Sequence, residues 1–181
     1  MARMQIALPD PSVVVLVGPA GAGKSTFATR HFAPEEVLSS DAFRALVAGD
    51  EADQAATRPA FAALHRALVG RLAAGRLTVV DATNVERHAR RAIVARARAT
   101  GVPAVAIVFD LDLDVVLARN AGRTGRVVEE SVVRRHHATL VTLLEAGGLR
   151  GPAAEGFAAV HRLRTADAVE RVRISRRSRR R

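Results

Sequence analysis

Residues 13–25 read Val-Val-Val-Leu-Val-Gly-Pro-Ala-Gly-Ala-Gly-Lys-Ser, an apolar run that leads directly into a glycine-rich segment. Five consecutive aliphatic residues without alternation are typical of a strand that is buried on both faces of a parallel sheet. The glycine-rich part matches the pattern G-x-x-x-x-G-K-[ST], and residues 24–32 read as a helix. Because strand, turn and helix follow in this order, residues 18–25 are predicted to cradle phosphate groups. We call them the phosphate loop.

Each residue type in the phosphate loop suits a nucleoside triphosphate. Glycines let successive backbone N–H groups turn inward around the β- and γ-phosphates, and the start of the helix adds partial positive charge. Lys24 adds a full charge on a flexible stem, and we expect this side chain to be exposed in the loop. Ser25 offers a hydroxyl group to Mg²⁺. The residues expected to bind ATP here are Gly18, Gly21, Ala22, Gly23, Lys24, Ser25 and Thr26.

The composition suggests a polyanionic partner and sets one lysine apart. The 181-residue chain has 28 basic residues, and Lys24 is the only one that is not arginine. A lysine at the one position where the phosphate chemistry needs it supports the nucleotide site. The net charge is +10, but seven arginines and no acid follow Glu170, which leaves +3 for residues 1–170. We expect one domain over residues 1–172 and a basic, disordered tail over residues 173–181.

Several classes of protein are excluded or disfavoured by what the sequence lacks. It has no cysteine, which excludes disulfides and thiolate chemistry and fits a reducing cytoplasm. Its only aromatic residues are six phenylalanines, so a nucleic acid would be held mainly by charge rather than by stacking. Apolar runs such as residues 13–17 are far shorter than a membrane span. We therefore expect a cytoplasmic protein without membrane contact.

Apolar segments alternate between strand-like and helix-like spacing along the chain, which predicts an α/β fold with a parallel sheet. The expected sheet has about five strands flanked by helices, with a lid of helix and loop. Expected strands cover residues 12–17, 37–39, 77–80, 104–109 and 157–163. Expected helices cover residues 24–32, 41–47, 57–75, 86–100, 114–120, 129–146 and 165–172, and a polar loop covers residues 49–56.

Asp41 and Arg44 follow the second expected strand and form a candidate acceptor site. Side chains at the carboxyl ends of parallel strands gather at the same edge of the sheet as the phosphate loop. A spacing of three residues places both on one face of a helix. The carboxylate can take a hydroxyl proton while the guanidinium holds a nearby anion. The alternative is a helix-capping aspartate beside a surface arginine.

Asp81 ends the third expected strand, where a carboxylate can hold Mg²⁺ directly or through water. Together with Ser25 it forms the predicted metal site, with Mg²⁺ arriving bound to ATP. The alternative for Asp81 is an aspartate that only begins a turn.

Arg119, Arg123 and Arg126 lie on a helix end and a glycine-broken segment, where they could close over the phosphates as a lid. An arginine on the transferring phosphoryl group stabilises its developing charge. The alternative for each is an ordinary basic surface. The predicted catalytic residues are Lys24, Asp41, Arg123 and Arg126, and the lid residues predicted to bind ATP are Arg119, Arg123 and Arg126.

With these residues placed, the chain resembles the kinase domain of bacterial polynucleotide kinase-phosphatases, which repair RNA ends, within the P-loop phosphotransferases. The resemblance spans residues 13–172, and its Ser-Asp-x-x-Arg and Asp-Ala-Thr-Asn motifs are more specific than the phosphate loop. The segments that carry it are residues 21–28, 37–44, 50–57, 77–84, 119–130 and 134–136.

This resemblance implies the P-loop kinase fold and ATP-dependent phosphorylation of 5′-hydroxyl ends of RNA or DNA, with further repair domains or proteins as partners. Asp41 would act as general base on that hydroxyl. Arg44 would hold the phosphate on the 3′ side of the terminal nucleotide, and Gln54 would contact the next phosphate. The lid arginines would bind and activate the phosphates of ATP.

Two other functions remain open on the sequence. One is a P-loop kinase of a small molecule, such as a sugar acid, a nucleoside or an antibiotic. The other is a non-catalytic module that binds nucleic acid and uses ATP as a switch. Substitution of Asp41 by asparagine separates an enzyme from a binding module, because a general base contributes about 10²–10⁴ in rate.

Overall fold

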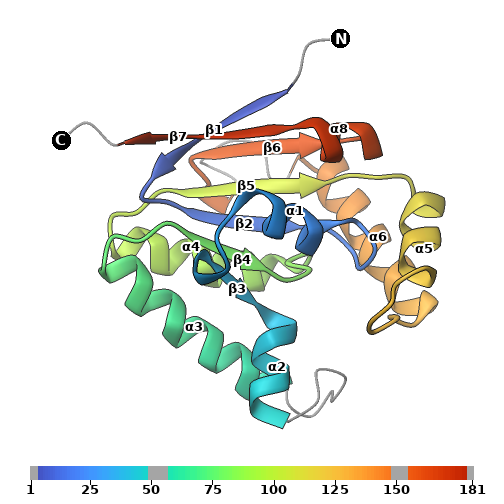
Figure 1. Ribbon diagram of the computed structural model, residues 1–181, viewed down its shortest axis with the longest axis horizontal. Helices are drawn as coiled ribbons and strands as arrows, with labels where there is room; N and C mark the ends of the chain where they lie inside the picture. The colour runs from blue at the N-terminus through green and yellow to red at the C-terminus, as the bar shows by residue number, and fades with distance from the viewer. Residues whose placement is uncertain (1–3, 49–56, 148–154, 179–181) are drawn as a thin grey trace.

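A five-stranded parallel sheet with the order β3-β4-β2-β5-β6 forms the centre of the protein (Figure 1). The computed structural model describes residues 4–48, 57–147 and 155–178. The predicted sheet is confirmed, with ends that differ from the prediction by at most two residues. Its strands are β2 (Val13–Val17), β3 (Val37–Ser39), β4 (Thr78–Asp81), β5 (Ala104–Phe109) and β6 (Ala159–Leu163).

Helices connect the strands and cover both faces of the sheet (Figure 1). The predicted loop over residues 49–56, which includes Gln54, lies outside the described residues. The described helices are α1 (Lys24–His31), the 3₁₀ turn η1 (Pro34–Glu36), α2 (Ser40–Ala48), α3 (Thr57–Ala73), α4 (Arg87–Ala99), α5 (Leu113–Ala121), α6 (Glu130–Glu145) and α8 (Ala166–Arg171).

The central strand β2 is buried on both faces, as its unbroken apolar run predicts. Every residue of Val13–Val17 is inaccessible to solvent. Alternate side chains of the strand enter two separate clusters, one containing Ile6 and Phe27, the other containing Leu68 and Ile93. Since helices on both sides pack against it, β2 holds the phosphate loop on a rigid support.

The C-terminal tail was expected to be disordered, and for residues 173–178 this expectation is wrong. They form β7 (Arg173–Ser178), which pairs in parallel with β1 (Gln5–Asp10), a strand that the sequence pattern did not predict. The pairing is stable because Ile6 and Leu8 of β1 are fully buried and Ile174 of β7 packs against the same core. The domain therefore continues beyond residue 172, and residues 179–181 lie outside the described part.

An ion pair between Arg176 and Glu36 also ties β7 to the domain. Both guanidinium NH groups donate to the carboxylate, at 2.7 Å each. The hydrogen bond from Arg176 holds the pKa of Glu36 below its usual value. Glu36 precedes β3, so the C-terminal strand is tied to the segment that leads to the predicted acceptor site.

Candidate functional site

A cleft of about 570 Å³ lies where the carboxyl ends of the strands meet the phosphate loop. Its wall combines most of the residues singled out in the sequence, although they come from six separate elements and loops. Those that line it are Gly21, Gly23, Lys24, Ser25, Thr26, Asp41, Arg44, Asp81, Arg119, Arg123 and Arg126. Gly18 and Ala22 lie behind this wall, where Ala22 packs in the core.

The phosphate loop passes so close to α5 that only glycine fits at one position. Gly21 has φ +83°, and a Cβ there would lie 2.2 Å from the backbone oxygen of Val116. Gly23, with φ +92°, caps the N-terminus of α1 in a left-handed conformation. These glycines bring backbone N–H groups and the start of α1 to the cleft, an arrangement suited to an anion.

Lys24 is buried, which corrects the expectation that it is exposed. Its side chain is 8% accessible, and Nζ donates a hydrogen bond of 2.8 Å to the carbonyl of Pro19. Burial lowers the pKa of Lys24 to about 8; Asp81 opposes this shift and Arg123 adds to it. The ammonium group of Lys24 is thus held against the phosphate loop. An anion in the cleft would stabilise the charged form of this group.

Asp81 ends β4 directly beside the start of the phosphate loop. In the sheet it is paired with Leu16 of β2 on one side and Ser39 of β3 on the other. Its side chain is buried and lines the cleft together with Ser25. A carboxylate and a hydroxyl on adjoining walls are oxygen ligands of the kind that Mg²⁺ prefers, so these two residues fit the predicted metal.

Asp41 and Arg44 lie on the first turns of α2 and form an ion pair with each other. The hydroxyl oxygen of Ser39 accepts a hydrogen bond from the N–H of Ala42 at 3.4 Å and so helps to begin the helix. Both side chains of the pair line the cleft. Their helix α2 follows β3 at one edge of the sheet, whereas α5, which carries Arg119, follows β5 beyond the central strand β2. The acid and the guanidinium that the sequence places on one helix face therefore lie together at the cleft, and the ion pair orients both groups.

The lid arginines line the cleft and are anchored at one end. Arg119 of α5 contacts Glu170 of α8 at 3.3 Å. Asn120 is buried, and its amide both donates to the carbonyl of Val128 at 2.7 Å and accepts from the N–H of Val128 at 3.2 Å. This clamp closes residues 121–127 into a loop that carries Arg123 and Arg126.

Sequence reasoning missed further residues of the cleft wall. Arg135 and His136 belong to α6 and share a face with Val132, which also lines the cleft. Their spacing of three and four residues could have revealed that face. Burial, with Arg135 beside it, lowers the pKa of His136, and no hydrogen-bond partner of its buried Nδ1 exists among the described residues. Other residues missed are Arg30, Phe61 and Glu170.

No group of three or more His, Cys, Asp or Glu side chains that could hold a metal ion occurs within the described ranges. Over those same ranges, none of the helices has the length and apolar character needed to cross a membrane.

The parallel sheet, the glycine-rich loop between β2 and α1 and the arginine-lined cleft define a protein with the P-loop kinase fold. The chain belongs to the AAA domain family named AAA_33, whose family profile matches residues 13–145. Membership in this family confirms the predicted fold class and assigns the chain to the P-loop phosphotransferases, which use ATP.

Solved structures with the same fold belong to proteins of different kinds. The Pnkp1/Rnl/Hen1 RNA repair complex matches with a TM-score of 0.66 and 23% identity, over 75% of this chain and 46% of that chain. A gluconokinase from Sinorhizobium meliloti 1021 matches with a TM-score of 0.53 and 20% identity, over 90% of each chain. The AvrRxo1-ORF1:-ORF2 complex with ATP matches with a TM-score of 0.63 and 17% identity, over 87% of this chain and 55% of that chain.

The chain thus spans less than half the length of the repair-complex chain. Among curated proteins, none matches the sequence. At these identities the solved structures show the fold alone.

Proposed function

We propose that the protein is an ATP-dependent polynucleotide 5′-hydroxyl kinase that acts on RNA or DNA ends in nucleic-acid repair. The observation that carries this proposal is the Asp41–Arg44 ion pair, which faces the phosphate-loop cleft from α2. An aspartate is ionised at neutral pH and can accept the proton of an alcohol. A guanidinium beside it suits an acceptor that carries a phosphate close to the reacting hydroxyl.

The charge of the cleft supports an acceptor that is itself anionic. Six arginines and Lys24 line it, against the three acids Asp41, Asp81 and Glu170. This is more positive charge than a magnesium-bound nucleoside triphosphate neutralises, and the surplus suits a backbone phosphate. The arginines are Arg30, Arg44, Arg119, Arg123, Arg126 and Arg135.

In the proposed reaction, the phosphate loop and Lys24 hold the β- and γ-phosphates of ATP. Ser25 and Asp81 would hold Mg²⁺, which neutralises phosphate charge when bound. The 5′-hydroxyl oxygen attacks the γ-phosphorus, and a new P–O bond forms as the bond to the β-phosphate oxygen breaks and ADP leaves. Asp41 takes the hydroxyl proton. Arg123 and Arg126 stabilise the charge on the transferring group.

A small-molecule kinase is the second candidate, because the gluconokinase shares the fold over 90% of each chain. A sugar acid carries a single carboxylate, which Arg44 alone could bind. This candidate predicts that the remaining arginines of the cleft serve only ATP. It therefore differs from the polynucleotide kinase in the acceptor alone.

Substitution of Asp41 by asparagine tests the catalytic role. We expect transfer of the γ-phosphate to a 5′-hydroxyl oligonucleotide to fall about 10²–10⁴-fold, with ATP affinity nearly unchanged. Asp114→Asn is the matched control, since Asp114 is an exposed aspartate in the first turn of α5 and does not line the cleft. Full transfer by Asp41→Asn would exclude Asp41 as the base, whereas an absence of transfer by the wild-type protein would favour the nucleotide-gated binding module.

A further inference from the structure

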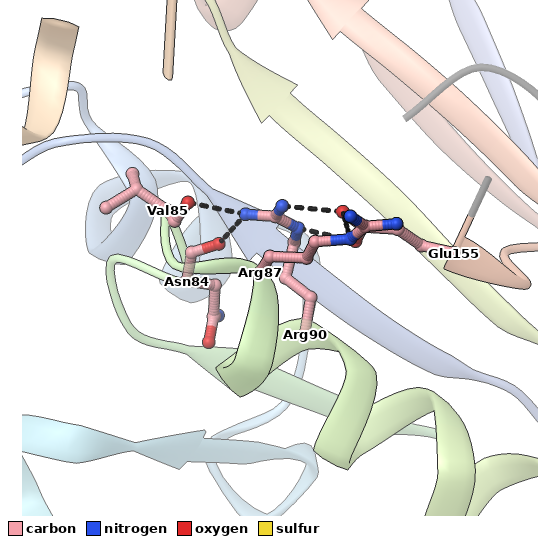
Figure 2. A network of polar contacts seen from close by, with 5 residues as sticks. All are labelled: Asn84, Val85, Arg87, Arg90 and Glu155. Carbon is pink, nitrogen blue, oxygen red and sulfur yellow. Dashed lines mark hydrogen bonds and ion pairs between the residues drawn. The ribbon is translucent and has the colours of Figure 1, made fainter. Parts of the chain in front are cut away.

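Arg90 of α4 and Glu155, which lies ahead of β6, form an ion pair inside the protein (Figure 2). Both side chains have 0% accessibility. Arg90 Nε donates to one carboxylate oxygen and its NH2 group donates to the other, at 2.7 Å each. A buried ion pair rarely stabilises a fold more than apolar side chains of similar size, because both charges lose their water. We therefore expect the Arg90–Glu155 pair to have a role other than stabilising the fold.

The remaining donor group of Arg90 holds the backbone of the loop after β4. Its NH1 group donates to the carbonyl oxygen of Asn84 at 2.8 Å and to that of Val85 at 2.6 Å (Figure 2). Glu155 balances the charge that this anchoring brings into the interior. Arg90 thus joins Glu155, near the start of β6, to the loop formed by residues 82–85.

The same loop holds both ends of the turn from β2 into the phosphate loop. The carbonyl of Thr83 accepts a hydrogen bond of 2.9 Å from the N–H of Gly18. The buried side chain of Asn84 donates to the carbonyl of Leu16 at 2.8 Å. Asn84 has φ +48°, a left-handed conformation that asparagine tolerates better than most residues. Ala82 and Thr83 line the cleft, and Asp81 comes directly before them.

We propose that Arg90 and Glu155 are positioning residues for ATP: they fix residues 82–85, and through these the first residue of the phosphate loop and the carboxylate of Asp81. Neither side chain lines the cleft, so the effect passes through the backbone of Asn84 and Val85. The inference rests on ATP binding at the phosphate loop, and it does not depend on which acceptor the protein phosphorylates.

The test is ATP affinity, measured by calorimetry without any acceptor, in the double variant Arg90→Met/Glu155→Leu. Its apolar side chains replace the buried charges at similar volume, so the melting temperature should stay within a few degrees of wild type. The dissociation constant for ATP should rise roughly tenfold. In a transfer assay, KM for ATP should rise while KM for the acceptor stays the same.

Two further variants keep the test decisive if the double variant fails to fold. Glu155→Gln keeps the shape and one of the two accepting oxygens while removing the charge, so Arg90 loses one of its two hydrogen bonds to this side chain, and ATP binding should weaken severalfold. Arg87→Ala is the matched control, because Arg87 is 64% exposed and approaches Glu155 only to 4.0 Å; it should bind ATP as wild type does.

A double-mutant cycle between Asn84→Ala and the paired change Arg90→Met/Glu155→Leu, which leaves no unpaired charge buried, separates positioning from general destabilisation. Since Asn84 and the ion pair act on the same loop, their effects on ATP affinity should be less than additive. Wild-type affinity for ATP in folded Arg90→Met/Glu155→Leu or in Glu155→Gln would overturn the inference. If the wild-type protein itself bound no ATP, the nucleotide site would fail, whereas failure to phosphorylate oligonucleotides alone would leave this inference standing.

Discussion

The two walls of the cleft are built in different ways. The donor wall consists of the phosphate loop and residues 82–85, and it is held by buried contacts such as Lys24 to Pro19 and Gly18 to Thr83. The proposed acceptor wall is the start of α2, where the partly exposed side chains of Asp41 and Arg44 meet in an ion pair. Rigid backbone therefore forms most of the donor wall, whereas side chains form the acceptor wall.

This difference explains why the fold identifies the class of protein but not the acceptor that it phosphorylates. Backbone geometry around a triphosphate is shared by proteins with different acceptors, including the gluconokinase that has the same fold. Side chains on the acceptor wall can differ without disturbing that geometry. Changes on the donor wall should therefore affect every acceptor equally, and changes on the acceptor wall should affect one class of acceptor.

Apart from the loss of the proposed base in Asp41→Asn, the largest effect is expected on the donor wall, from Lys24→Ala. Loss of the ammonium should reduce transfer about 10²–10³-fold for all acceptors alike, because the charge acts on the phosphates of ATP. Lys24→Met is the shape-matched control and should lose as much. Melting temperature should change little, since the lost hydrogen bond is offset by removal of a buried charge. Transfer near the wild-type rate would contradict the assigned role.

A smaller and more selective effect is expected on the acceptor wall, from Arg44→Ala. Loss of a charged hydrogen bond should lower kcat/KM for an oligonucleotide about 10- to 100-fold, with ATP affinity and transfer to a nucleoside unchanged. Arg66→Ala is the control, because Arg66 is exposed on α3 and does not line the cleft. An equal loss with every acceptor would place Arg44 on the donor side instead.

The donor wall also predicts a pH dependence of ATP binding. Without nucleotide, burial holds the pKa of Lys24 at about 8, and bound phosphates should raise it. Below pH 8 the amine is protonated in both states, so affinity should be flat. Above pH 8 the free protein must regain a proton to bind ATP, and affinity should fall by up to about tenfold per pH unit.

Calorimetry in two buffers of different ionisation enthalpy measures that proton. Uptake should approach one proton per ATP above pH 8 and should be absent from Lys24→Met. An ATP affinity that is constant from about pH 7.5 to 9.5 would show that Lys24 does not change its protonation on binding.

The smallest effect is expected far from both walls, from Arg176→Ala in β7. An exposed ion pair contributes up to about 1 kcal/mol, so the melting temperature should fall by a few degrees with turnover unchanged. Because Arg176 holds the pKa of Glu36 below its usual value, this stabilisation is present above the ordinary pKa of Glu36 and is lost as pH falls through the lowered one. Arg177→Ala, at the neighbouring exposed position, is the control. A lowered kcat at saturating substrate would instead connect the C-terminal strand with the active site.

The sequence predicted the central sheet mainly because its two innermost long strands, β2 and β5, are dense apolar runs bounded by turn residues. It failed at the chain ends for a physical reason. In β1 only Ile6 and Leu8 alternate, and two prolines follow them, while β7 carries arginines that resemble a solvated tail. Each strand is stable only because the other pairs with it, and this pairing joins residues at opposite ends of the chain.

Within the site, the sequence predicted residue types at the ends of strands and missed what tertiary packing creates. The burial of Lys24 depends on the carbonyl of Pro19 and on the elements around the cleft, none of which local spacing reveals. Arg90 and Glu155 are 65 residues apart, and nothing in either segment predicts that they meet. Gln54, predicted from family resemblance to contact a backbone phosphate, lies outside the described residues and stays a prediction.

The central claim, that the acceptor is a polynucleotide end, is tested most directly by comparing acceptors in one assay. Transfer of labelled γ-phosphate from ATP would be measured to 5′-hydroxyl RNA and DNA oligonucleotides, to a nucleoside and to gluconate. The proposal predicts label on an oligonucleotide 5′ end, with kcat/KM at least about 100-fold above that for the nucleoside or gluconate, as expected if backbone phosphate contacts provide the acceptor's binding energy. Equal or faster labelling of gluconate or the nucleoside would contradict it.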